Sequence, residues 1–160
     1  MTEIEKEIID AGKIDRILGK AKICRIALID GKFPYILPMF FGYSITGGKL
    51  ELYFRCEEKG KKMDIIKQNG NAAFEVENFI EIIPGDNPVE FSGVYQSITG
   101  TGTIEVITGI DKITGLSLIM SKYDESCENK ECSLSEQMLN SFAVLKLTAD
   151  EFCCKERNVQ

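Results

Sequence analysis

The chain has 160 residues, of which 44% are apolar and 28% are charged, a balance typical of a soluble globular protein. That length is enough for one domain over residues 1–160 with a core of its own. The net charge of −6 excludes nucleic acid as the main partner, because phosphate backbones are bound by basic surfaces.

Residues 1–20 form the first predicted segment. Its isoleucines recur at roughly helical spacing, interrupted at Gly12, which predicts one or two short helices. The opening MTEIEKEIID is acidic and lacks the charged-then-apolar layout of a secretory signal. No apolar run approaches the ~18 residues needed to span a bilayer. We therefore expect a cytoplasmic protein with no membrane partner.

A β-hairpin is predicted next. Residues 23–29 alternate as a strand does, and Asp30-Gly31 follows, which favours a type I′ turn because that turn needs positive φ. Residues 34–44 supply an aromatic-rich return strand. Pro38 lies within it and cannot donate to a sheet ladder, so this strand should be at an edge or carry a bulge.

The stretch over residues 49–76 points to a ligand. An alternating strand over residues 49–55 leads into Gly60-Lys61-Lys62 and a helix over residues 59–68, which Asn69-Gly70-Asn71 ends. Free N–H groups at a helix N-terminus attract anions, and nearby lysines add charge. This arrangement predicts a phosphate site. The alternative is a solvated, lysine-rich start of a helix.

The rest of the chain continues the mixed pattern of strands and helices. Its longest alternating run has glycines at 100 and 102, which indicate a bend or the close approach of another backbone or a ligand. The predicted elements are a strand at 72–77, a loop at 81–90, a strand at 91–107, a helix at 110–120, a short helix at 134–139, a last strand at 143–147 and a loose tail at 155–160.

The histidine and cysteine content limits the possible chemistry. With no histidine, haem on a proximal imidazole, histidine-based zinc catalysis and a Ser-His-Asp triad are excluded. Six cysteines in a cytoplasmic protein are expected to be reduced thiols. The C-x2-C pairs of common structural zinc sites are absent, so we predict no metal centre. Four thiols still leave zinc or an iron–sulfur cluster as an alternative: Cys127, Cys132, Cys153 and Cys154.

Antiparallel strands joined by hairpins, with helices at the start, middle and end, predict a small closed or split β-barrel. A Rossmann domain is disfavoured because no G-x-G-x-x-G follows a strand. The order of motifs also resembles a known family. The four motifs are CRIALIDGKFPYILPMFFGY, LYFRCEEKGKKMDIIKQNGNAAFEV, YQSITGTGTIEV and VLKLTADEF.

These motifs resemble the flavin-binding split barrels of the pyridoxamine 5′-phosphate oxidase-like group, in particular its nitroimidazole-reductase-like branch. The resemblance covers most of residues 20–153 and implies a mainly β split barrel with peripheral helices. It also implies an FMN cofactor at the interface of a homodimer. By position, the implied flavin ligands are Leu37, Pro38, Met39 and Phe40 through backbone groups, Phe54 and Arg55 along the ring or ribityl chain, Lys61 and Lys62 at the 5′-phosphate, and Gln96 and Ser97 as a polar pair from the later strand.

The chain departs from this branch at Arg55. Members of the branch often have a histidine directly after the aromatic strand, in a Tyr-Phe-His pattern. A guanidinium stays charged and exchanges no proton near neutral pH, but it can bind phosphate or stabilise negative charge. With arginine at this position we still expect FMN binding, but we do not expect a histidine-dependent step.

The resemblance implies an FMN-dependent oxidoreductase that passes electrons from NAD(P)H to a small, flat, electron-poor acceptor, such as a nitroaromatic or a quinone. A non-catalytic protein that stores flavin or senses redox state through its thiols is an alternative. Pyridoxamine-phosphate oxidation is a further one, although ADEFCCKERN lacks a matching basic-aromatic pattern. The aromatic strand could form the wall of the acceptor site. Alternatively, its rings belong to the core, which is the commoner position of such residues. These residues are Phe33, Tyr35, Phe40, Phe41 and Tyr43.

Overall fold

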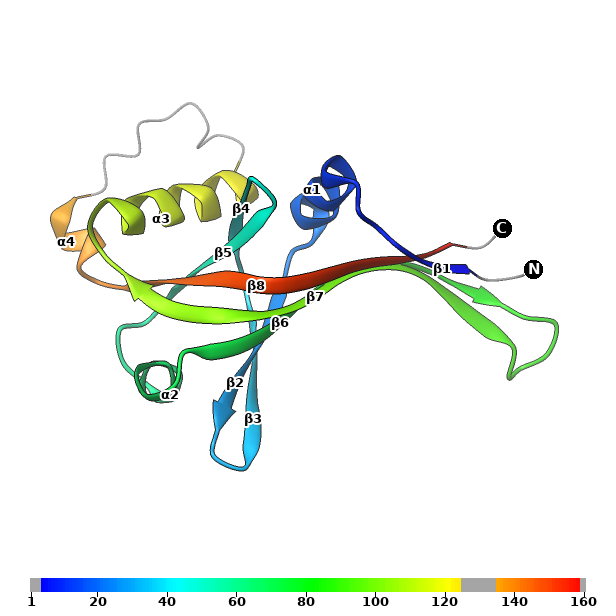
Figure 1. Cartoon of the computed structure of the whole chain (residues 1–160), viewed down its shortest axis with the longest axis horizontal. Helices are drawn as coiled ribbons and strands as arrows, with labels where there is room; N and C mark the ends of the chain where they lie inside the picture. Colours follow the sequence, from blue (N-terminus) through cyan, green and yellow to red (C-terminus); the bar gives the residue numbers. More distant parts are fainter. Residues whose placement is uncertain (1–3, 125–134, 159–160) are drawn as a thin grey trace.

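The computed structural model describes residues 4–124 and 135–158, which form a mainly antiparallel split β-barrel with helices around it (Figure 1). The strand order is β3-β2-β6-β7-β8-β5-β4, and β1 pairs with β8 outside this path. The strands are β1 (Ile4–Glu7), β2 (Cys24–Asp30), β3 (Phe33–Met39), β4 (Gly42–Thr46), β5 (Lys49–Cys56), β6 (Asn71–Pro84), β7 (Phe91–Ile107) and β8 (Ala143–Asn158).

The split in the barrel lies between β3 and β4. These are the two end strands of the ordered path, yet only Phe40 and Phe41 separate them in the chain. The predicted return strand over residues 34–44 is therefore two strands on opposite edges. Pro38 is on an edge strand, as predicted, and its only ladder partner is Arg25 of β2. This edge leaves backbone groups of β3 without a neighbouring strand.

The first hairpin forms, but its turn differs from the predicted one. Asp30 pairs with Phe33, so the two turn residues are Gly31 and Lys32. Gly31 has a φ of 59°, and among the described residues only glycines have positive φ. A type I′ turn needs positive φ at both central positions, whereas glycine alone at the first position suits a type II′ turn.

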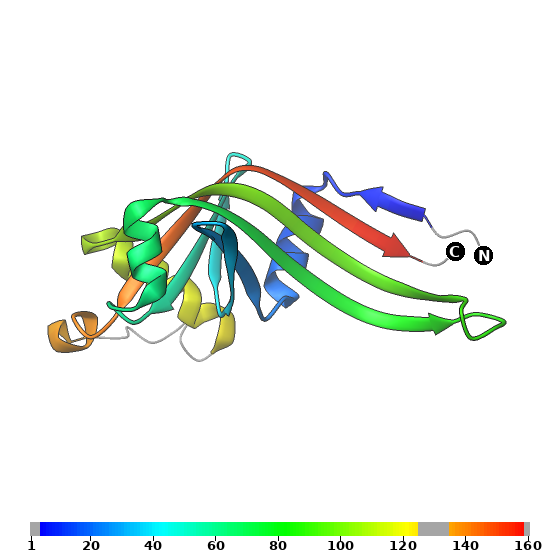
Figure 2. The same cartoon turned by 90° about the horizontal axis from the view of Figure 1, so that it is seen from below.

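Two strands, β6 and β8, are longer than the sequence predicts, and together with β7 they extend as a curved arm beyond the barrel (Figures 1 and 2). The predicted loop over residues 81–90 is shorter, because β6 continues to Pro84 and pairs with β7. The predicted loose tail after residue 154 is instead part of β8, which runs to Asn158. Ile4–Glu7 pairs with this end of β8, so the first segment is a strand followed by a helix. The end of β6 is stabilised by pairing with β7, and the end of β8 by pairing with β7 and β1.

The four helices are α1 (Ala11–Lys20), α2 (Lys61–Gln68), α3 (Gly109–Tyr123) and α4 (Glu136–Leu139). Asp10 caps α1 by accepting a bond from the Lys13 N–H at 2.7 Å. Ile14, Ile17 and Leu18 bury one face of α1 against the main core. A smaller core under α3 joins Leu116 and Ile119 to side chains of β5, β7 and β8. Among the described residues, no helix combines the length and apolarity that a membrane crossing requires.

Candidate functional site: a cavity at the split of the barrel

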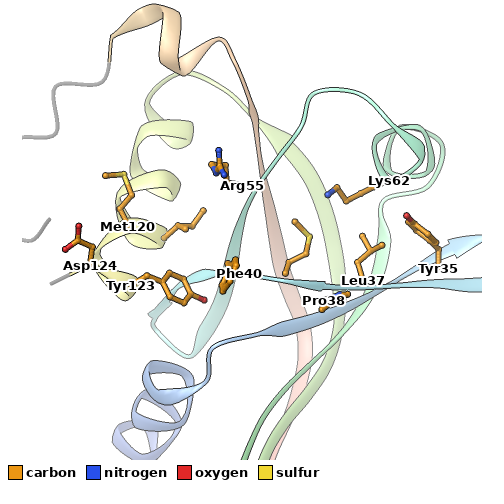
Figure 3. Close-up of a pocket in the computed structure, with 11 residues that line it drawn as sticks. Tyr35, Leu37, Pro38, Phe40, Arg55, Lys62, Met120, Tyr123 and Asp124 are labelled. Carbon is orange, nitrogen blue, oxygen red and sulfur yellow. The ribbon is translucent and has the colours of Figure 1, made fainter. Parts of the chain in front are cut away.

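A cavity of about 750 Å³ lies beside the split of the barrel (Figure 3). Sites for small molecules and cofactors commonly have roughly 300–1,000 Å³. Its floor comes from β3, one wall from β5 and α2, and the other wall from the end of α3. The residues that line it are Tyr35, Leu37, Pro38, Met39, Phe40, Arg55, Lys62, Ile119, Met120, Tyr123 and Asp124.

The floor follows from strand geometry. Alternation along β3 directs Tyr35, Leu37 and Met39 to one face, where they pack against the main core. Because β3 is an edge strand, its outer backbone N–H and C=O groups are available to a ligand, except that Pro34 and Pro38 have no N–H. Phe40 follows the strand and is 63% exposed. The floor is therefore apolar, with a row of hydrogen-bonding groups along its rim.

Two cations project from the wall formed by β5 and α2. Lys62 lies in the first turn of α2 and extends its amine over the cavity, and Arg55 lies on β5 (Figure 3). Gly60 precedes the helix with φ of 118°, a conformation that favours glycine. Among the described residues, neither Arg55 nor Lys62 forms an ion pair with a carboxylate. The guanidinium of Arg55 instead lies 5.7 Å from the centre of the Phe142 ring.

Tyr123 fixes the opposite wall. Its hydroxyl accepts a hydrogen bond from the Phe41 N–H at 3.0 Å and donates one to the Lys22 carbonyl at 2.8 Å. Its ring meets that of Phe40 edge-on, with 5.3 Å between ring centres. Burial raises the pKa of Tyr123 above its ordinary value. A hydroxyl bonded on both sides, with a raised pKa, positions the chain and is a poor proton donor.

Lys122 supports this wall from behind without lining the cavity. Its amine donates to the carbonyl oxygens of Leu18 and Gly19 at the end of α1. It also lies 4.6 Å from the centre of the Phe41 ring and 5.5 Å from that of Tyr43. Burial, and then the nearby charge of Lys22, lowers the pKa of Lys122 to about 8. The lysine therefore links α1, α3 and the start of β4.

The structure brings six of the ten sequence-predicted ligands together at the cavity: Leu37, Pro38, Met39, Phe40, Arg55 and Lys62. Phe54 is fully buried in the main core. Lys61 lies outside the lining and pairs with Asp30 at 2.6 Å. Gln96 and Ser97 are on β7, also outside the lining, and Gln96 is in register with Glu156, which pairs with Lys13 of α1. A flavin contact stays a prediction for all ten residues.

The aromatic strand divides in the same way. Tyr35 and Phe40 line the cavity, whereas Phe41 is fully buried. The Tyr43 hydroxyl donates to a carboxylate oxygen of Asp15 at 3.0 Å, and burial raises its pKa to about 12. Phe33 is 70% exposed at the far end of β3. One aromatic segment thus supplies residues both to the core and to the lining of the cavity.

Sequence reasoning missed the wall formed by α3. Ile119, Met120, Tyr123 and Asp124 line the cavity, yet the predicted helix over residues 110–120 contains only the first two, and the other two follow it in the sequence. No local signal marks them, because their position depends on how α3 packs on β4 and β5. Gly42 of β4 permits that packing: a Cβ there would lie 2.5 Å from the backbone nitrogen of Ile119.

The cysteines do not gather in the part of the chain that the structure describes. Cys153 and Cys154 are neighbours on β8, and both are free thiols. Cys127 and Cys132 lie outside the described residues. Among those that are described, no three histidine, cysteine, aspartate or glutamate side chains are placed to hold a metal ion.

Comparison with known proteins identifies relatives of the whole chain. A family model described as pyridoxamine 5′-phosphate oxidase matches residues 10–156. Comparison with curated proteins gives no match. Similar solved structures include a candidate 5-nitroimidazole antibiotic resistance protein from Bacteroides thetaiotaomicron, with 22% identity over 100% of this chain and 93% of that one and a TM-score of 0.77. The FAD and heme binding protein from Mycobacterium smegmatis has 21% identity over 96% of this chain and 74% of that one, with a TM-score of 0.80. The flavocytochrome Anf3 from Azotobacter vinelandii has 16% identity over 96% and 70%, with a TM-score of 0.77.

Proposed function

The chain belongs to the pyridoxamine 5′-phosphate oxidase family, and from that premise we propose that it is an FMN-dependent oxidoreductase. In this proposal the cavity at the split of the barrel holds the flavin. Electrons pass from NADH or NADPH to a small, flat, electron-poor acceptor. The names of two structural relatives, which refer to FAD and heme binding and to a flavocytochrome, both include a flavin and so support a flavin cofactor here.

One observation carries the proposal: two cations without carboxylate partners among the described residues face an apolar floor whose rim is an unpaired strand edge. FMN combines the same features, a phosphate at one end and a flat ring with polar edges at the other. Lys62 and the N–H groups at the start of α2 suit the phosphate. The backbone of β3 suits the polar edge of the ring. The residues present therefore fit the cofactor.

When bound, a flavin supplies the redox chemistry, taking a hydride from reduced nicotinamide and giving electrons to the acceptor. The protein contributes position and charge. Lys62 fixes the phosphate end, and the β3 backbone orients the ring. Arg55 stabilises negative charge beside the ring and, being permanently charged, exchanges no proton. Phe40 and Tyr123 exclude water from one side of the cavity.

We also propose that the protein is a homodimer with the cavity at its interface. Phe33, Ile36 and Phe40 of the β3 segment are 70%, 61% and 63% exposed, which is unusual for three large apolar side chains so close in sequence. A second copy seated there would cover them and close the open side of the cavity. Sedimentation equilibrium measures this directly, since the mass of one chain is 17.9 kDa.

Anaerobic reduction tests the function. The FMN-loaded protein is mixed with NADH or NADPH while the flavin absorption is followed, and a nitroaromatic compound is then added. We expect the flavin absorption to decrease after NADH or NADPH is added, and to return when the nitroaromatic acceptor is added. Bound flavin that stays oxidised with both nicotinamides would favour the non-catalytic alternative.

A further inference from the structure

The arm ends in an exposed apolar hairpin. This arm tip, residues 79–95, is the part of the β6–β7 hairpin that begins where Tyr95 pairs with Arg157 of β8 (Figures 1 and 2). Its large apolar side chains are 53–84% exposed: Phe79, Ile80, Ile82, Val89 and Phe91. A two-stranded hairpin alone in water is only marginally stable, and large exposed apolar patches mark interaction sites. The tip therefore has the character of a surface that a partner covers.

The arm tip is also acidic. Residues 79–95 contain three carboxylates and no lysine or arginine. All three side chains are exposed, and none of them forms an ion pair with another described residue: Glu81, Asp86 and Glu90. Charges at the rim of an interface favour a partner of complementary charge. The surface that fits the arm tip is therefore both apolar and basic.

The outer face of the β2–β3 hairpin is apolar. Ile29 pairs with Pro34, and Ala27 pairs with Ile36. Because side chains alternate along a strand and paired residues share a face, these four residues lie on one side of the hairpin. Ile29 is 51% exposed and Ile36 is exposed to a similar extent. This face is continuous with the β3 surface that the proposed dimer covers through Ile36.

Two cations lie beside this hairpin. Lys32 is in the turn between β2 and β3, and Lys59 lies just before α2. Both are exposed, and neither has a carboxylate partner within the described part of the chain. Lys59 is close to the hairpin because Lys61, two residues further on, pairs with Asp30 at the end of β2. The hairpin thus combines an apolar face with positive charge.

We propose that the arm tip of each chain docks on the outer face of the β2–β3 hairpin of a second copy. Within one chain the two surfaces lie apart, since the arm and the hairpin project from the barrel in different directions in both views (Figures 1 and 2). With a two-fold axis the tip of each copy meets the hairpin of the other, so the contact closes with two copies. The inference rests on the homodimer of the proposed function and gives it a second contact.

The apolar area of the arm tips is large enough for a stable dimer. Covering roughly 100 Å² on each of the five apolar side chains, in both symmetric contacts, buries on the order of 1,000 Å². The hairpin faces that the tips cover add to this area. The arm contact alone therefore reaches the size expected of a specific interface.

Charge exchange between the two surfaces tests the inference. One variant, Glu81→Lys with Glu90→Lys, makes the arm tip basic. A second variant, Lys32→Glu with Lys59→Glu, makes the hairpin acidic. Each variant alone places like charges in both contacts of its own dimer, so we expect it to dimerise at least about tenfold more weakly than the parent. Sedimentation equilibrium at low salt measures the dissociation constants, with 17.9 kDa as the mass of one chain.

An equimolar mixture of the two variants restores both contacts. In a mixed dimer the basic tip meets the acidic hairpin, and the unaltered acidic tip meets the unaltered basic hairpin. We expect the mixture to dimerise with a dissociation constant within about threefold of the parent's. A monomeric parent, a variant that dimerises as tightly as the parent, or a mixture as weak as its components would overturn the inference.

A matched control separates the arm tip from net charge. Asp111→Lys with Glu136→Lys makes the same change in net charge as the arm variant. The substitutions lie at the starts of α3 and α4, at the end of the molecule opposite the arm (Figure 1). This control should dimerise as the parent does. A loss equal to that of the arm variant would show that net charge controls association, and would also overturn the inference.

The design separates this inference from the proposed function. Dimerisation is measured without FMN, and FMN uptake and its reduction by NADH or NADPH are measured separately on the parent. If the mixture regains the dimer but the parent takes up no flavin, the proposed oxidoreductase fails and the docking of the arm stands. If nicotinamide reduces the bound flavin but the mixture stays monomeric, only the docking of the arm is wrong.

Discussion

Lys61 and Asp30 form an ion pair, with 2.6 Å between the amine nitrogen and a carboxylate oxygen. The same amine lies 4.9 Å from the centre of the Tyr35 ring. Its neighbour Lys62 instead lines the cavity. Two adjacent lysines at the start of α2 look equivalent in the sequence. In the structure, the charge of Lys61 is paired with a carboxylate, whereas Lys62 presents its charge to the cavity.

The first prediction compares these two lysines. Lys62→Ala should weaken FMN binding by about ten- to hundredfold, because a hydrogen bond to a charged group is lost. Lys61→Ala should weaken it by less than about threefold, because that amine is already paired with Asp30. Fluorescence titration of FMN measures both. Equal losses in the two variants would show that the lysines act as a pair.

The second prediction concerns Gly42, where β4 touches α3. A Cβ at Gly42 would lie 2.5 Å from the Ile119 nitrogen and 2.8 Å from the Leu118 oxygen, both of them backbone atoms. Gly42→Ala should therefore displace α3 and lower the free energy of unfolding by about 1–3 kcal/mol. Gly12→Ala is the control, since its Cβ would meet only an Asp10 oxygen at 3.5 Å. If urea denaturation gives Gly12→Ala a lower free energy of unfolding than Gly42→Ala, the result would contradict this packing.

The third prediction follows from the lowered pKa of Lys122, about 8 in the folded protein against an ordinary value of 10.5. Between those two values the unfolded chain binds more protons than the folded one, so this residue's contribution to the free energy of unfolding rises with pH. Below about pH 8 the contribution is constant and unfavourable.

Lys122→Met removes this titration. Groups that do not interact with Lys122 titrate equally in both proteins, so the difference in the free energy of unfolding, parent minus variant, reports the titration of Lys122 and its coupling to Lys22. That difference should increase between about pH 8 and about pH 10.5 in urea denaturation. A difference that is flat or falls over this range would mean that the amine of Lys122 is not held in a desolvated position.

The fourth prediction tests the register of β8 through its adjacent cysteines. Cys153 is half-buried, whereas Cys154 is 2% exposed, and burial raises its pKa to about 11. Alkylation needs an accessible thiolate, so Cys153 should be modified well before Cys154. Brief treatment with iodoacetamide followed by peptide mass spectrometry distinguishes them. Faster modification of Cys154 would place the opposite face of β8 toward the core.

The sequence predicts the elements whose signal is local. The strand over residues 91–107 has the predicted bounds, since its alternation is uninterrupted. The helix predicted at 59–68 forms at Lys61–Gln68, where Gly60 provides the start. The extension of β6 to Pro84 could not be predicted, because prolines and a glycine in residues 81–90 indicate a loop and only pairing with β7 overrides them.

Only part of the candidate site could be predicted from the sequence, because only part of it has a local sequence pattern. The β3 and β5 residues, together with Lys62, follow from motifs along the chain, and the structure gathers them at one cavity. The α3 wall depends on a close contact between Gly42 and Ile119 across the fold, which leaves no pattern in the sequence. The division of Lys61 from Lys62 depends likewise on Asp30, which lies on a different hairpin.

Titration of the unmodified protein with FMN, followed by quenching of flavin fluorescence, measures whether the cavity at the split of the barrel holds the flavin. We expect saturable binding of one FMN to each chain, with competition by inorganic phosphate at the end formed by α2. Quenching that rises without saturation, or the same titration in a Lys62→Ala and Arg55→Met double variant as in the parent, would contradict it.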